Sequence, residues 1–130
     1  MQNELPSMSV APQYRDALRR LMLNDEDFFN VVVARNSGAG RKDDALASTQ
    51  ALDDRTRRLL DIAAVIALGG EPNGIDAATR SALDAGASPE DVVEVLLDLA
   101  PILGRGRVAA AAGPIATAIG YDVWLDFEEA

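Results

Sequence analysis

The residues of this chain that can do chemistry are carboxylates and guanidiniums. The sequence contains no cysteine and no histidine, which excludes a thiolate nucleophile, thiol redox chemistry, an imidazole base and a histidine metal site. Catalysis would have to use Asp, Glu, Arg, Ser, Thr, Tyr or the single lysine, Lys42. Five side chains stand at useful positions, and these are Glu71, Asp76, Arg80, Arg105 and Arg107.

The two acids are the candidates for acid/base catalysis. Glu71 lies in a turn that leads into a predicted helix. A carboxylate beside a helix N-terminus can act as a general base, whereas the plainer interpretation is a solvated residue whose charge suits the helix dipole. Asp76 stands four residues before Arg80, which is the favourable order for a pair on one helical face. Asp76 is therefore either a second acid/base group or half of an ordinary surface ion pair.

The three arginines are the candidates for holding a substrate carboxylate. Arg80 would do so from its helix, beside Asp76. Arg105 and Arg107 flank Gly106 directly after a predicted helix end. Two guanidiniums on a glycine-containing loop can bind a small anionic ligand. The alternative is that they compensate the negative end of the preceding helix.

No metal site or cofactor is expected. Asp91, Glu94 and Asp98 share one helical face, but hard cations draw on more oxygen ligands than one such face supplies. A solvated face is the interpretation we favour. The glycines of the GAG motif at 38–40 are not followed by the Lys-Ser/Thr of a phosphate-binding loop.

The length and composition of the chain predict one globular domain that spans residues 1–130. The chain has 130 residues, of which 48% are hydrophobic, and a formal net charge of −9. This acidic balance argues against nucleic acid and against an anionic membrane surface as partners. The sequence contains no run of 18 apolar residues, which is about the length needed to cross a membrane. Its first residues lack the pattern of a secretory signal. We therefore expect a cytoplasmic protein.

The spacing of apolar residues predicts an all-α bundle of about six helices. Residues 28–35 contain three consecutive valines, so a strand is the alternative there. Residues 1–11 are expected to be a flexible arm and 36–50 a loop, and residues 121–130 either a short strand or a docking tail. The predicted helices are 12–23, 25–35, 54–68, 74–85, 89–103 and 108–119.

Capping residues and prolines predict where these helices begin and end. Asn24, Asp53 and Ser88 are the expected N-caps, and Asn73 with Asp76 resembles a capping box. Two interior prolines are expected to interrupt helices. Pro101 would kink or end the fifth helix, and the pair Gly113-Pro114 would break the sixth.

The segment from Ile62 to Leu68 is apolar on every side. A helix that is apolar all round must be buried all round. In a chain of this size, we expect a partner subunit to supply part of that burial.

Four segments from Leu52 to about Gly120 occur in the order of a known family. They are LDDRTRRLLDIAAVIALGG, IDAATRSALDAGAS, PEDVVEVLLDLAPILG and the alanine-rich segment that follows. In this order they resemble the carboxymuconolactone decarboxylase superfamily, which includes the alkylhydroperoxidase D-like proteins. The resemblance implies an all-helical fold that assembles as a homo-oligomer, commonly a trimer or a hexamer.

The departures from the family pattern concern its chemistry. Redox-active members carry Cys-x-x-Cys before the active-site helix, a His four residues after the second Cys, and a Glu in the preceding helix. Matched from the helix side, the two Cys positions hold Glu71 and Gly74, the His position Ala78 and the Glu position Arg58. Matched from the preceding helix, the register shifts by one residue. Dithiol peroxidase activity is excluded, since no thiolate can form.

Two hypotheses about function remain. The favoured one is a non-catalytic, oligomeric binding or assembly module. The alternative is a non-redox acid/base enzyme of the decarboxylase, isomerase or lyase type, which acts on a small carboxylated or lactone substrate. In that enzyme Glu71 or Asp76 would be the acid/base group, and Arg80, Arg105 and Arg107 would hold carboxylates. As the replacement for the family Glu, Arg58 is expected to form a structural ion pair with Asp54, Asp61 or Asp98.

Overall fold

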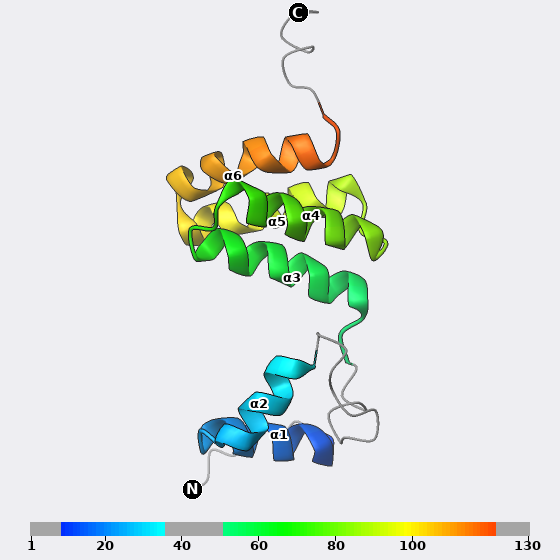
Figure 1. Cartoon of the computed structure of the whole chain (residues 1–130), viewed down its shortest axis with the longest axis vertical. Helices are drawn as coiled ribbons and strands as arrows, with labels where there is room; N and C mark the ends of the chain where they lie inside the picture. Colours follow the sequence, from blue (N-terminus) through cyan, green and yellow to red (C-terminus); the bar gives the residue numbers. More distant parts are fainter. Residues whose placement is uncertain (1–8, 36–50, 122–130) are drawn as a thin grey trace, which may run out of the picture. The chain divides into compact units, whose positions relative to one another are not determined.

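The computed structural model describes residues 9–35 and 51–121, and within them it contains six α-helices (Figure 1). The chain divides into two compact units, Met1–Ala51 and Leu52–Ala130, and each is described by itself. The predicted loop at 36–50, the tail after Tyr121 and most of the predicted arm at 1–11 lie outside the described residues. No helix in the described ranges is long and apolar enough to cross a membrane.

The first unit contains α1 (Pro12–Met22) and α2 (Glu26–Ala34). The valine-rich segment is helical, so the helix prediction is confirmed over the strand alternative. The predicted N-cap Asn24 is wrong by one residue, because the Asp25 side chain accepts the N–H of Phe28 instead. Asn24 has a φ of 53°, and this left-handed backbone differs from the extended conformation of an N-cap.

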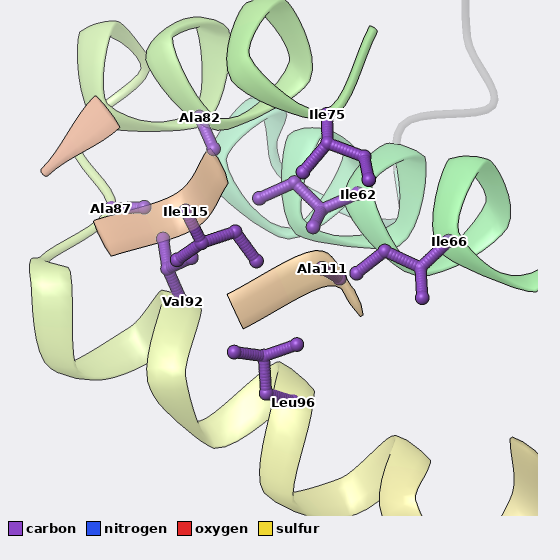
Figure 2. Packing of buried hydrophobic residues seen from close by; sticks show 9 residues of the cluster. All are labelled: Ile62, Ile66, Ile75, Ala82, Ala87, Val92, Leu96, Ala111 and Ile115. Atoms are coloured by element: carbon purple, nitrogen blue, oxygen red, sulfur yellow. The ribbon is translucent and has the colours of Figure 1, made fainter. Parts of the chain in front are cut away.

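The second unit is a bundle of four helices with short connections. They are α3 (Asp54–Ala67), α4 (Pro72–Asp84), α5 (Pro89–Leu103) and α6 (Arg105–Ala118). Consecutive helices run in opposite directions (Figure 1), and α3 and α6 each pack against α4 and α5. All four helices contribute to the core, which Figure 2 shows; its cluster is Ile62, Ile66, Ile75, Ala82, Ala87, Val92, Leu96, Ala111 and Ile115.

The helix starts follow the predicted caps at two of three positions in this unit. Asp53 caps α3 through the N–H of Thr56, and Ser88 opens α5 with a complete capping box. The predicted capping box of Asn73 and Asp76 is wrong, because α4 begins at Pro72 with Glu71 as its N-cap. Proline suits the first helical position, where its missing N–H has no intrahelical partner to lose.

The two interior prolines do not break their helices. α5 continues past Pro101 to Leu103, and α6 continues through Pro114 to Ala118. The predicted break at Gly113-Pro114 is therefore wrong. Ile115 and Ala118 are buried beyond Pro114, so tertiary packing holds a turn that the proline alone would disfavour.

The segment Ile62–Leu68 is not buried all round within one copy of the chain. Ile62 and Ile66 are buried in the core, but Ala64, Ala67 and Leu68 are exposed. The bundle covers one face of the helix and leaves the other open. Leu68, at the end of α3, is 85% exposed.

Candidate functional site

The candidate site lies where α3 ends and where α4 and α6 begin. These three helix ends meet at one end of the bundle (Figure 1). They enclose a cavity of about 160 Å³, called the hollow below. Cavities that hold drug-sized ligands are typically 300–1,000 Å³, so the hollow is small. It is lined by Ile66, Gly69, Gly70, Pro72, Ile75, Arg107, Ala110 and Ala111.

Two glycines shape the connection from α3 to α4. Gly69 has a φ of 73°, the left-handed conformation that commonly ends helices. The N–H of Gly70 donates to the carbonyl oxygen of Val65 at 2.8 Å. A Cβ added at Gly70 would contact the Val65 side chain and come within 2.8 Å of its carbonyl oxygen. This close approach requires glycine at position 70 and forms one wall of the hollow.

Arg107 supplies the one charged side chain among the described residues that line the hollow. It lies in the first turn of α6, and its Nη1 donates a hydrogen bond to the carbonyl oxygen of Ala67, the last residue of α3. The expected glycine loop around Gly106 is therefore wrong, because residues 105–107 are helical. Arg107 compensates the negative end of α3 rather than that of the preceding helix, α5.

Arg105 is exposed and makes no ion pair within the part of the chain that the structure describes. Like Arg107 it stands in the first turn of α6, where the helix dipole disfavours a positive charge. Its side chain does not line the hollow. The two arginines that the sequence placed together thus have different surroundings.

Glu71 is the N-cap of α4 and lies between two residues that line the hollow, Gly70 and Pro72. Its side chain makes no capping hydrogen bond, it is exposed, and it is not part of the lining. Glu71 is therefore at the rim, where water reaches its carboxylate.

Asp76 and Arg80 form the predicted pair, with Arg80 Nε 2.9 Å from Asp76 Oδ2. The hydrogen bond to Asp76, with its negative charge, raises the pKa of Arg80 above its usual value. Neither side chain lines the hollow. Of the five candidate residues, the structure brings Arg107 to the hollow and Glu71 to its rim, and it places the other three elsewhere.

Arg58, which replaces the family Glu, forms the structural ion pair that the sequence predicted. Its guanidinium lies 3.3 Å from Asp54 and 2.9 Å from Asp61. Both partners are on α3 itself, at three- and four-residue spacing. Asp98, the third partner considered, is not used.

The three acids that share one face of α5, Asp91, Glu94 and Asp98, have different surroundings. Asp91 closes the Ser88 capping box and contacts Arg55 at 3.3 Å. The hydrogen bond from the Ser88 N–H lowers the pKa of Asp91 below its usual value, and the charge of Arg55 adds to this. Glu94 and Asp98 are exposed. Among the residues that the structure describes, no group of three acids is placed to hold a metal ion.

Sequence reasoning missed a larger concave surface in the same unit. A groove of about 560 Å³ lies between the start of α5 and the end of α6 and is lined by Pro89, Glu90, Val93, Glu94, Ile119 and Tyr121. Its two halves are separated by more than twenty residues of chain. No local pattern links them, so only the packing of α6 on α5 could reveal this α5–α6 groove.

The described fold defines an all-α protein whose small hollow is formed by helix ends and glycines. Residues 34–117 match the family model described as Carboxymuconolactone decarboxylase family. The chain belongs to this family. The match starts before the segment at 52–120 in which the motifs are found. Comparison with curated proteins gives no match, and neither does comparison with solved structures.

Proposed function

We propose that this chain is a non-catalytic member of the carboxymuconolactone decarboxylase family that works as a homo-oligomeric assembly module. The proposal has two parts. One is that the hollow carries out no acid/base reaction, and the other is that the bundle formed by α3 to α6 associates with further copies of itself.

The observation that best supports the non-catalytic part is the set of side chains that line the hollow. The family resemblance matches the two Cys and the His of redox-active members to positions 71, 74 and 78. Here the lining consists of apolar residues and glycines plus Arg107, whose guanidinium is bound to the end of α3. A general base must lie within hydrogen-bond reach of the proton it removes, and no carboxylate lines this space among the described residues.

Exposed apolar side chains support the assembly part. Leu68 is 85% exposed and Ile102 is 75% exposed. Both lie at the end of the bundle where the hollow is, Leu68 after α3 and Ile102 near the end of α5. Large apolar groups that gather on a surface mark interaction sites. The family commonly forms homo-oligomers, so a second copy is the partner that we propose for this end.

Sedimentation equilibrium of the full chain tests the assembly part. We expect a trimer or hexamer, which the paired change Leu68→Glu and Ile102→Glu should convert to smaller species. The matched control is Thr117→Glu, which adds a charge at an exposed position near the end of α6. A monomeric wild-type chain would contradict the proposal, and so would an oligomer that the paired change leaves intact.

Turnover assays test the non-catalytic part separately. We expect no conversion of small lactones or carboxylated ring compounds by the purified protein. Turnover that is lost in Glu71→Gln, with the helical content unchanged, would establish the acid/base enzyme instead. Turnover lost in Arg105→Ala but kept in Glu71→Gln would also overturn the non-catalytic part, with a different residue responsible.

A further inference from the structure

We infer that the α5–α6 groove binds a small amphipathic cation, meaning a protonated amine on an apolar body. The groove is separate from the hollow, and nothing in the assembly proposal uses it. Its volume of about 560 Å³ falls within the range of small-molecule sites. Its lining combines apolar side chains with two carboxylates.

The walls favour an apolar body. Pro89 and Val93 come from the first turns of α5, and Ile119 and Tyr121 follow the last residue of α6, Ala118. Val93 is 39% exposed and Tyr121 is 49% exposed. Covering such surface with an apolar ligand removes it from water, which is the main favourable term in binding of this kind.

The charges on the groove select a cation. Glu90 and Glu94 both line it and stand four residues apart on α5, so their carboxylates share one face. Both are exposed, and within the described ranges neither forms an ion pair. The described residues that line the groove include no basic side chain. A positive group is attracted there and an anion repelled, and the Tyr121 ring adds a surface to which ammonium groups bind.

The sequence argues against the chain's own end as the occupant. Residues 122–130 include Asp122, Asp126, Glu128 and Glu129 and no basic residue. Placing them beside Glu90 and Glu94 would bring like charges together, which is unfavourable. A ligand with an amine avoids this repulsion.

Titration of the full chain with hexylammonium, followed by amide NMR shifts, tests the inference. The matched probes are 1-hexanol, which lacks the charge, and hexanoate, which reverses it. We expect saturable shifts at Val93 and Tyr121, with affinity falling from hexylammonium to hexanol to hexanoate. Added salt should weaken the binding of hexylammonium, because it screens exposed charges.

Substitutions locate the charges responsible. Glu94→Gln should raise the Kd for hexylammonium about threefold, and Glu90→Gln with Glu94→Gln about tenfold, as expected for exposed ion pairs. Asp98→Asn is the matched control, since it removes an exposed acid of the same helix outside the groove. It should leave the Kd unchanged.

Three results would overturn the inference. One is the lack of saturable shifts, and another is equal affinity for hexylammonium and hexanol. The third is binding that appears only when Trp124 and Phe127 are both changed to Ala in the full chain, which would identify the tail as the occupant. None of these depends on the oligomeric state, so failure here and failure of the assembly proposal are distinguishable.

Discussion

The two ends of the α3–α6 bundle are constructed differently. At the end where α3 and α5 begin, called the capped end, side chains satisfy the first N–H groups of both helices. Asp53 accepts from Thr56 at 2.8 Å, and Ser88 accepts from Asp91 at 3.0 Å. An ion pair from Arg55 to Asp91 links these two helix starts. Side-chain capping of α3 to α6 is therefore concentrated at this end.

At the opposite end, which contains the hollow, α4 and α6 begin without side-chain caps. Glu71 makes no capping bond and neither does Gly104. Two arginines occupy the first turn of α6, where the helix dipole opposes them. Among the starts of α3 to α6, side-chain capping is thus confined to the end that lies away from the hollow.

The largest expected effect comes from the wall of the hollow. Gly70→Ala would push a Cβ against the side chain and carbonyl oxygen of Val65 and should destabilise the fold by about 2 kcal/mol. Gly74→Ala is the matched control, because its Cβ would meet Val65 at an ordinary 3.8 Å. That change should stabilise α4 by about 0.5–1 kcal/mol.

Urea denaturation at fixed protein concentration measures both variants. Fixed concentration matters because association adds to apparent stability. Equal effects of the two substitutions would mean that the close approach at Gly70 does not constrain this end of the bundle.

The next largest effect is a difference in stability between changes at the start of α5 and at the start of α4, which lie at opposite ends of the bundle. Ser88→Ala removes the capping box of α5 and should cost about 1 kcal/mol. Glu71→Ala removes an exposed side chain that caps nothing and should change stability by less than about 0.5 kcal/mol. Thermal unfolding of the two variants measures the difference. A larger loss for Glu71→Ala would reverse the contrast between the ends.

A smaller effect separates the two arginines of α6. Arg107→Gln should cost about 0.5 kcal/mol, because Arg107 neutralises the end of α3. Arg105→Gln should stabilise the fold by a similar or smaller amount, since it removes a positive charge that the dipole at the start of α6 disfavours. Urea midpoints at low and high salt measure both changes. The same sign for both variants would contradict this assignment.

The smallest effect is confined to acid pH. The pKa of Asp91 is lowered in the fold, so its contribution to stability is complete above the unfolded-state pKa and is lost as the pH falls through the folded-state value. Asp91→Asn should therefore flatten the dependence of stability on pH below about pH 4. Asp98→Asn, which removes an exposed acid of the same helix, is the variant measured beside it. Parallel curves for Asp91→Asn and the wild type would rule out this role of the capping box.

Prediction from sequence succeeded where the cause is local. The Ser88-Pro89-Glu90-Asp91 start, the cap at Asp53 and the pair of Asp76 with Arg80 each depend on residues within four positions of one another. It failed at Pro114, where burial of Ile115 and Ala118 holds the helix together. It also failed at residues 105–107, whose helical conformation begins directly after a single glycine, Gly104.

The sequence by itself determined the all-α class and the exclusion of thiol and imidazole chemistry, because composition, periodicity and local spacing carry that information. The family came from a resemblance of four ordered segments to its members, which the family match supports. Only the tertiary structure decided which candidates meet. Arg107 reaches Ala67 across forty residues of chain, whereas Arg105, two residues before it, does not line the hollow. It also created the α5–α6 groove from two distant segments. The physical reason is that the distance between side chains on different helices is set by how those helices pack, which no local pattern encodes.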